Sequence, residues 1–315
     1  MAIGYIKRKK LGEGTYATIY LADEIETEDS SKIYYSPTCT IKPIRKVAIK
    51  KIKRSDMIKG LDLSAIREIK SLRKIDSRYV IKILNVFYFS KTLNIVLEYV
   101  ESNLEIIIKD RSIIIMPEDI KAWSYMILRG LFACHSKFIL HRDIKPNNIL
   151  ITVTGIVKLA DFGLSRSIST QSMTPQAITR WYRPPELLLG SKLYSFGVDM
   201  WSFGCVFAEL FLRTPYFPGD DDIKQLDTIF KALGTPSEKD WPSLTLLPNF
   251  IKFPIYQRHP LKNLFSAVSD DALDLLSKLL TYDPSKRITC LNALKHPYFI
   301  NLPRPTIPEK LPFSE

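Results

Sequence analysis

The chain has 315 residues, of which 46% are hydrophobic and 25% charged, and this ordinary globular composition excludes a disordered, collagen-like or coiled-coil chain. It contains no run of 18 apolar residues and its four cysteines lie far apart, so we expect no membrane span, no membrane partner and no disulfide framework. The formal net charge is +12, most of it in the first third, which favours a solvated basic surface or else a surface for nucleic acid or a phosphorylated partner.

The first third of the chain is predicted to consist mainly of strands. Residues 9–23 alternate along two short runs on either side of a glycine turn, which is typical of two strands. Acidic residues, then Ser, Pro and Tyr, interrupt the pattern over 24–46, and we expect a surface loop inserted there. The next elements in chain order are a strand at 47–50, a helix over 64–75 and a strand at 94–100.

The rest of the chain is predicted to be mainly helical. Apolar residues recur at helical spacing from Ile120 to Cys134, and the run from Asp199 to Leu212 is typical of a buried helix. The length suits one large enzyme domain with two lobes. We therefore expect an α+β protein, with a small antiparallel β-sheet lobe carrying one helix at 1–100 and a larger helical lobe at 101–315.

A glycine turn separates the first two predicted strands, at Gly12-Glu13-Gly14. Such a strand–turn–strand lets main-chain N–H groups approach phosphate oxygens. Ala17 stands where a third glycine would complete the usual pattern, and an ordinary glycine hairpin is the alternative.

Two charged residues occupy positions that the apolar pattern would bury. Lys50 lies two residues after Ala48 on one strand face, and Glu68 falls within the apolar stripe of the helix over 64–75. An unpaired charge at either place would be costly, so we expect Lys50 to pair with Glu68. The alternative is that each lies at the edge of its apolar face.

The strongest chemical signal is the segment from His141 to Asn148, which lies between two apolar, strand-like runs. Its carboxylate Asp143, amine Lys145 and amide Asn148 can together reach one nucleophile, one phosphate and one cation. A second carboxylate, Asp161, follows another predicted strand. Asn148 and Asp161 supply the oxygen ligands that Mg²⁺ prefers.

These motifs resemble those of eukaryotic protein kinases, over residues 9–23 and 47–312. The resemblance implies the bilobal protein kinase fold, ATP and Mg²⁺ as cofactors, and transfer of the ATP γ-phosphate to Ser or Thr of protein substrates. It also implies a structural ion pair between Glu186 and Arg287. The motifs that carry it are the glycine turn, Val47-Ala48-Ile49-Lys50, Glu68, His141-Arg142-Asp143, Asp161-Phe162-Gly163 and Pro184-Pro185-Glu186.

The resemblance assigns roles to individual residues. Asp143 would accept the proton of the substrate hydroxyl, with Lys145 and Thr179 completing the catalytic set of a serine/threonine kinase. Asn148 and Asp161 would be catalytic as metal ligands. The implied ATP-binding residues are Leu11, Gly12, Glu13, Gly14, Thr15, Tyr16, Ala17, Thr18, Ile19, Ala48, Lys50, Glu68, Leu97, Glu98 and Val100.

Among kinases, the segment Leu63-Ser64-Ala65-Ile66-Arg67-Glu68 is similar to the cyclin-binding helix of cyclin-dependent kinases, which implies a cyclin partner. Without the cyclin we expect this helix to swing out and the lone chain to be almost inactive. The family also implies that Arg67, Arg142 and Arg166 converge on a phosphorylated Thr174. Three solvated arginines are the alternative.

A narrower resemblance is to the kinase subunit of transcription factor TFIIH. It implies that the protein activates other cyclin-dependent kinases and phosphorylates the C-terminal repeats of RNA polymerase II, in transcription and cell division. It implies the nucleus, with the cytoplasm as a second compartment, an assembly factor and the TFIIH core as further partners, and only indirect contact with nucleic acid. The motifs are Gly-Glu-Gly-Thr-Tyr-Ala, Lys59-Gly60-Leu61-Asp62, the segment 103–110 and Ile178-Thr179-Arg180-Trp181.

Three alternatives stay open. The first is a cell-cycle kinase on proline-directed substrates, with Thr15 and Tyr16 as inhibitory phosphorylation sites. The second is a pseudokinase scaffold, and the third a basic nucleic-acid-binding module, although no recognised motif for the latter is present. The insertion at 24–46, Asn103 and Pro184 depart from the TFIIH subfamily, and leave assembly with the TFIIH core and substrate choice open.

Overall fold

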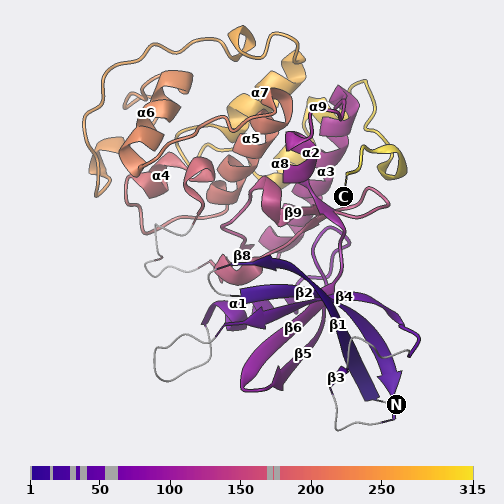
Figure 1. The fold of residues 1–315 in the computed structure, drawn as a ribbon. Helices are drawn as coiled ribbons and strands as arrows, with labels where there is room; N and C mark the ends of the chain where they lie inside the picture. The colour runs from indigo at the N-terminus through magenta and orange to yellow at the C-terminus, as the bar shows by residue number, and fades with distance from the viewer. Residues whose placement is uncertain are drawn as a thin grey trace.

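The protein consists of a β-sheet lobe and a helical lobe that meet near the middle of the molecule (Figure 1). The two-lobed α+β arrangement predicted from the sequence is therefore confirmed. The computed structural model describes residues 2–14, 17–28, 33–35, 41–53, 63–168, 173 and 178–314.

The first lobe is built on one sheet, in the strand order β3-β1-β2-β4-β6-β5. All neighbouring strands are antiparallel except β3 and β1, which run parallel. The strands are β1 (Ala2–Glu13), β2 (Ala17–Thr27), β3 (Tyr34–Tyr35), β4 (Arg45–Ile52), β5 (Ile83–Phe89) and β6 (Thr92–Glu98).

The segment 24–46 differs from the surface loop expected there. β2 continues through Ile25, whose side chain is fully buried, and β4 already begins at Arg45. Between them, β3 adds a sixth strand beside β1, with Tyr34 opposite Tyr5. Burial of Ile25 explains why the acidic start of the segment still forms a strand, because its apolar side chain is removed from water.

The sheet curls so strongly that strands far apart in its order come into contact. Tyr5 on β1 stacks on Phe87 of β5, with ring centroids 5.3 Å apart, and Tyr34 meets the same ring edge-on at 5.7 Å. The curl encloses a small second core that includes Tyr5, Val47 and Val96. Aromatic pairs in these arrangements stabilise beyond the area they bury.

Helix α1 (Leu63–Leu72) packs between the sheet and the second lobe. Ala65 and Leu72 are buried in the main core, and the Ser71 hydroxyl hydrogen-bonds to the Ser165 hydroxyl at 2.8 Å. The expected helix over 64–75 is thus observed, three residues shorter at its end.

The second lobe surrounds α5, which Figure 1 shows among the other helices. Every residue of α5 from Val198 to Leu210 is buried, as expected of a helix that is apolar on all sides. Its long neighbour α3 begins with Pro117 and carries Glu118 and Asp119 in its first turn, which suits a helix N-terminus. The helices are α2 (Leu104–Lys109), α3 (Pro117–His135), α4 (Pro185–Leu188), α5 (Gly197–Leu212), α6 (Asp222–Leu233), α7 (Asp270–Leu279), α8 (Cys290–Leu294) and α9 (Pro297–Ile300).

Short strands of the second lobe lie on either side of the loops that face the first lobe. β9 lies between β10 and β7 in one small sheet, and β8 pairs with β11 in another. Because β6 ends at Glu98 and Ser102 already pairs within the second lobe, the chain crosses between lobes over 99–101. The division at residue 100 stays a prediction. The short strands are β7 (Ser102–Asn103), β8 (Ile139–Leu140), β9 (Ile149–Ile151), β10 (Val157–Leu159) and β11 (Arg166–Ser167).

A buried ion pair ties the end of the second lobe to its middle. Both terminal guanidinium nitrogens of Arg287 donate to the Glu186 carboxylate, at 2.7 and 3.0 Å, which confirms the predicted pair. In the described part of the chain, no helix has the length and apolar character needed to cross a membrane.

Gly130 in α3 packs tightly against the Tyr79 backbone and the Leu159 side chain. A Cβ atom there would lie 2.8 Å from the Tyr79 carbonyl oxygen and 2.9 Å from a methyl carbon of Leu159. Because the Tyr79 oxygen belongs to the backbone, we expect Gly130→Ala to lower the free energy of unfolding by about 1–3 kcal/mol in urea denaturation. Arg129→Ala, at an exposed position of the same helix, is the control and should change it by about 0.5 kcal/mol at most.

Candidate active site

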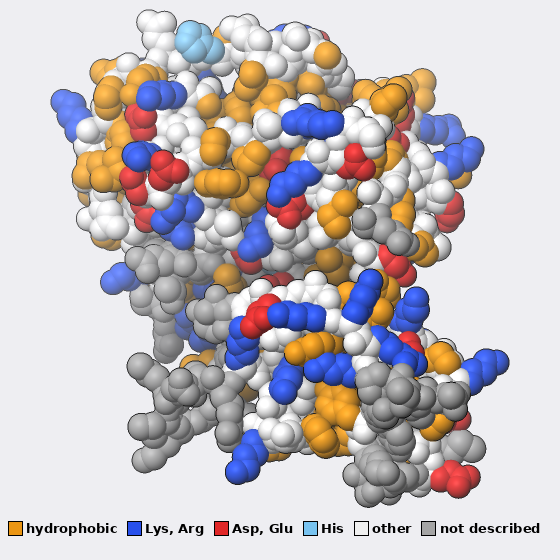
Figure 2. Space-filling model, viewed as in Figure 1, with side chains coloured by type: hydrophobic (Ala, Val, Ile, Leu, Met, Phe, Trp, Pro, Cys, Tyr) orange, Lys and Arg blue, Asp and Glu red, His pale blue; other side chains and the backbone are white. Residues whose placement is uncertain are grey.

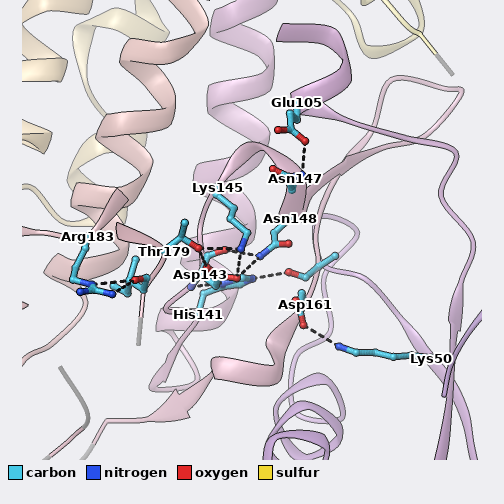
Figure 3. Close-up of polar contacts among 12 residues, drawn as sticks. Lys50, Glu105, His141, Asp143, Lys145, Asn147, Asn148, Asp161, Thr179 and Arg183 are labelled. Atoms are coloured by element: carbon cyan, nitrogen blue, oxygen red, sulfur yellow. Dashed lines mark hydrogen bonds and ion pairs between the residues drawn. The ribbon is translucent and has the colours of Figure 1, made fainter. Parts of the chain in front are cut away.

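The carboxylate of Asp143 is the centre of the candidate site. It lies in the loop between β8 and β9 and is held on both oxygens (Figure 3). Oδ1 accepts a hydrogen bond from the Thr179 hydroxyl at 2.8 Å. Oδ2 accepts one from the Asn148 amide at 2.7 Å and lies 2.8 Å from the Lys145 ammonium. Lys145 also donates to the Thr179 hydroxyl, at 3.0 Å. The four side chains, predicted to act together, do lie together.

His141 fixes the loop to the strand that precedes Asp161. Its Nε2 lies 3.0 Å from the Ala160 carbonyl oxygen, while its Nδ1 accepts a hydrogen bond from the Asp143 backbone N–H at 3.2 Å. This arrangement requires the neutral ring with the proton on Nε2. Complete burial agrees, because it lowers the pKa of His141 despite the nearby carboxylates.

Asp199, in the first turn of α5, fixes the same loop to the second lobe. Its Oδ2 accepts from the His141 N–H at 2.9 Å and lies 2.9 Å from His135 Nε2, while Oδ1 accepts from the Arg142 N–H at 2.8 Å. Burial would raise the pKa of Asp199, but these donors and the nearby histidines hold it below its usual value. The sequence reasoning did not identify Asp199. The signal available was a carboxylate at the start of a mostly apolar run, which contains one other carboxylate, Glu209.

Lys50 reaches the site from β4. Its ammonium lies 2.8 Å from Glu68 and 2.9 Å from Asp161, which confirms the predicted pair with Glu68 (Figure 3 shows the contact with Asp161). Burial alone would lower the pKa of Lys50, but the charges of the two carboxylates raise it above its usual value. Lys50 is therefore held as an ammonium ion.

The expectation that α1 swings out in the lone chain is wrong for this structure. The ion pair between Lys50 and Glu68 is formed, and α1 is docked against the second lobe through Ser71 and Ser165. The side chains of Ala65 and Leu72 contribute apolar burial on the same face, so the inward position has its own stabilising contacts.

Asn148 and Asp161 offer oxygens that fit Mg²⁺. Both amide hydrogens of Asn148 are used, on the main-chain oxygen and the carboxylate of Asp143, which leaves its carbonyl oxygen for a cation. Asp161 is half exposed and gives one oxygen to Lys50. Burial would raise the pKa of Asp161, but Lys50 holds it below its usual value, so the second oxygen is a charged ligand. Two protein oxygens suit Mg²⁺, which takes its other ligands from phosphates and water.

The described members of the predicted ATP-binding set lie on or next to strands of the first lobe, apart from Glu68 on α1. Gly12 and Glu13, predicted as part of a turn, extend β1 and pair with Ile19 and Thr18 of β2. Ala48 and Leu97 are opposite each other on β4 and β6, and Val100 follows β6. The Glu98 carboxylate contacts Lys158 at 2.9 Å, and the Glu98 N–H donates to the Lys82 carbonyl oxygen at 3.0 Å. Thr15 and Tyr16 lie outside the described residues; the others within β1 and β2 are Leu11, Gly12, Glu13, Ala17, Thr18 and Ile19, with Gly14 following β1.

The three predicted phosphate-binding arginines have different environments. Arg67 is exposed on α1 and Arg166 is half-buried in β11. Arg142 is buried, and donates to the Leu164 carbonyl oxygen at 2.7 Å and to the Tyr194 hydroxyl at 2.8 Å. Thr174 lies outside the described residues, so their convergence on it stays a prediction.

The segment after Thr179 is fixed to the second lobe. The Arg183 side chain donates twice to the Ile178 carbonyl oxygen, at 3.0 and 2.8 Å, and once to Asp222 at 3.1 Å. The Tyr182 hydroxyl donates to the buried Glu209 carboxylate at 2.8 Å. These contacts hold Thr179 beside Asp143.

The protein kinase domain family matches residues 5–299 of this chain. The chain is 58% identical to a probable serine/threonine-protein kinase, a KIN28 homolog of Encephalitozoon cuniculi, over 98% of this chain and 99% of that protein. It is 45% identical to cyclin-dependent kinase 7 of Dictyostelium discoideum, over 96% of this chain and 81% of that protein. Among solved structures, the CAK complex of Chaetomium thermophilum bound to ATP-gamma-S superposes with a TM-score of 0.88 at 44% identity, covering 99% of this chain and 95% of that chain. The predicted protein kinase fold is thereby confirmed.

Glu209 generates a pH prediction. Burial raises its pKa to about 7, although the Tyr182 hydrogen bond lowers it. A folded-state pKa above the unfolded value gives stability that is complete below about pH 4.5 and is lost as the pH rises through about 7. From pH 5 to pH 8, we expect the free energy of unfolding of the wild type to fall by about 2–3 kcal/mol relative to Glu209→Gln. Urea denaturation at pH 5 and pH 8 measures this difference in the free energy of unfolding. Glu238→Gln, at an exposed position, is the control and should keep the pH dependence of the wild type. The same pH dependence in wild type and Glu209→Gln would contradict the prediction.

Proposed function

The chain belongs to the protein kinase family, in its cyclin-dependent serine/threonine branch, and we infer that it transfers the γ-phosphate of ATP to Ser or Thr of proteins through Asp143. The observation that carries this assignment is the arrangement of Asp143, Lys145, Asn148 and Thr179 facing Asp161 and Lys50. It argues against the pseudokinase alternative, because each charged group needed for transfer is present and paired.

Asp143 is suited to orient the substrate hydroxyl and accept its proton. Thr179 and Asn148 each hold one carboxylate oxygen, which fixes the plane of the group at the moment of attack. Lys145 lies 2.8 Å from the same carboxylate and can steady the charge on the transferred phosphoryl group. The lone pairs of Asp143 not used in these bonds remain for the hydroxyl.

Lys50 is suited to bind the ATP phosphates. Its contact with Asp161 places the ammonium beside the two residues proposed to hold Mg²⁺. The cation, when bound by Asn148 and Asp161, would neutralise charge on the phosphates. Glu68 keeps Lys50 in position, so a shift of α1 would displace it.

The outer side of α1 supports a cyclin partner. Leu63 is 65% exposed and Ile66 38% exposed on this helix, while its opposite side is buried. Exposed apolar side chains on one helix face are typical of a protein interface. Since α1 also carries Glu68, a partner held there would fix the ion pair with Lys50.

The substrates and further partners follow from the subfamily. We propose that the protein activates other cyclin-dependent kinases and phosphorylates the C-terminal repeats of RNA polymerase II. The support is the similarity to KIN28 and cyclin-dependent kinase 7, and to the CAK complex. We also propose binding to an assembly factor and to the TFIIH core, residence in the nucleus, and control by phosphorylation of Thr174. The cell-cycle alternative rests on Thr15 and Tyr16, which lie outside the described residues, so it stays open.

Asp143→Asn tests the chemical role. The amide keeps the shape of the side chain but cannot accept the substrate proton, so we expect kcat to fall by about 10²–10⁴-fold while ATP binds within about twofold of wild type. A radiometric kinase assay and nucleotide titration on the cyclin-bound protein measure both. Asp220→Asn, at an exposed position, is the control. Turnover near the wild-type rate in Asp143→Asn would exclude this residue as the base.

Ile66→Asp tests the cyclin surface. A charge at the exposed apolar position should weaken cyclin binding by at least about tenfold and lower activity with it, because the aspartate must be desolvated in the interface. Ile255→Asp, at an 88% exposed position of the other lobe, is the matched control. Co-purification with cyclin and an assay of each complex measure the effect. Equal cyclin binding by the two variants would remove α1 from the interface.

A further inference from the structure

The outer face of the sheet holds a hollow of about 420 Å³ that no step of phosphoryl transfer uses. It is lined by side chains from both ends of the sheet and from the inserted strand β3. We call it the outer hollow and define it by Lys7, Arg8, Tyr34, Lys51, Phe89 and Asn94.

The outer hollow lies on the opposite side of the sheet from the active site. Lys50 and Lys51 are consecutive in β4, so their side chains point to opposite faces. Lys50 reaches Glu68 and Asp161 in the cleft, whereas Lys51 lies in register with Asn94 of β6 on the outer face. A ligand in the outer hollow would therefore not compete with ATP.

The floor and one wall of the hollow are rigid. The Asn94 side chain is only 1% exposed and accepts a hydrogen bond from the Tyr34 hydroxyl at 3.1 Å. Tyr34 also meets the Phe89 ring edge-on at 5.0 Å. Burial raises the pKa of Tyr34 to about 12, so this wall carries no charge at neutral pH. The insertion thus supplies a fixed aromatic wall rather than a free loop at this point.

Two lysines give the hollow its charge. Lys7 holds its ammonium 3.2 Å from the centre of the Tyr20 ring, and Lys51 is exposed. Within the described ranges, neither lysine has a carboxylate at ion-pair distance. Arg8 follows Lys7 at a bulge in β1, and its guanidinium is engaged with Asp23 at 2.7 Å. Lys7 and Lys51 are therefore the two lysines lining the hollow whose charge no carboxylate of the described ranges neutralises.

This combination of an aromatic wall and two cations suits a compact dianion. Figure 2 shows Lys and Arg side chains around a hydrophobic patch on the visible face of the sheet lobe. A nucleic acid strand presents a charge at each step along its backbone and is bound by a line of cations. Here the cations border one hollow, which matches a single phosphoryl group on a side chain.

We propose that the outer hollow binds a phosphorylated Ser or Thr of a protein substrate, as a docking site separate from the active site. The choice of substrate rests on the proposed function: repeats of the polymerase C-terminal domain that are already phosphorylated would be held there. Unmodified repeats elsewhere on the same substrate chain would then be held close to the enzyme, which raises their effective concentration at Asp143. The site would raise the affinity for partly phosphorylated chains without altering the chemical step.

Direct binding is the first test. A fluorescent single-repeat peptide carrying one phosphoserine is titrated with the full chain at 0.15 M salt, using wild type, Lys7→Gln/Lys51→Gln and the control Lys42→Gln/Lys46→Gln. The control removes the same charge from exposed lysines of the same lobe that do not line the hollow. We expect the Kd to rise by about tenfold or more in the first pair and by less than about twofold in the control. Equal loss in both pairs overturns the proposal, since the attraction would then be non-specific.

Two further measurements separate the remaining outcomes. If a single-stranded DNA of equal charge binds the outer hollow more tightly than the phosphopeptide, the ligand is a nucleic acid and the proposal is wrong. In the cyclin complex, Lys7→Gln/Lys51→Gln should raise KM for a partly phosphorylated multi-repeat substrate and leave kcat and KM for an unphosphorylated single repeat unchanged. Failure of the wild-type complex to phosphorylate that single repeat would instead contradict the proposed function, independently of the hollow.

Discussion

The geometry of the active site depends on one buried carboxylate, that of Asp199. It accepts the backbone N–H groups of His141 and Arg142 and contacts His135, so it sets the path of the loop that carries Asp143. Arg142 has a φ of 65°, a left-handed conformation that costs a non-glycine residue free energy. The hydrogen bond from its N–H to Asp199 offsets that cost. Because α5 is buried along almost its whole length, Asp199 attaches the loop to a rigid helix.

The second constraint joins the lobes. Asp161, also left-handed with a φ of 60°, directs its carboxylate to Lys50 on the sheet, while His141 holds the neighbouring Ala160 carbonyl oxygen. Lys50 is thus bound by one carboxylate from each side of the cleft. The relative position of the lobes, the charge state of Lys50 and the position of α1 are consequently linked. A partner that moves α1 acts on the phosphate site through Glu68, without touching the nucleotide.

The sequence predicted the parts of the site whose signals are local. Asp143, Lys145, Asn148 and Asp161 stand in short motifs beside apolar strands, and pairing of Lys50 with Glu68 followed from two charges on buried faces. The role of Asp199 was not predicted because its partners lie 57 to 64 residues away in the sequence. The only local indication was a carboxylate in a mostly apolar helix. The curl of the sheet was not predicted for the same reason. It depends on contacts between β1, β3 and β5, which the alternation of residues along single strands does not encode.

The alternation of side chains along β4 also determines on which face of the sheet each of its lysines lies. The strand's period of two directs Lys50 into the cleft and Lys51 to the outer face, so one strand serves both sides of the sheet. The insertion then matters through Tyr34, which packs on Phe87 and Phe89 and closes the curled face at its open end. A register slip of one residue in β4 would exchange the two lysines and remove the ion pair with Glu68. The pairing that fixes the catalytic lysine therefore also fixes the lysine of the outer hollow.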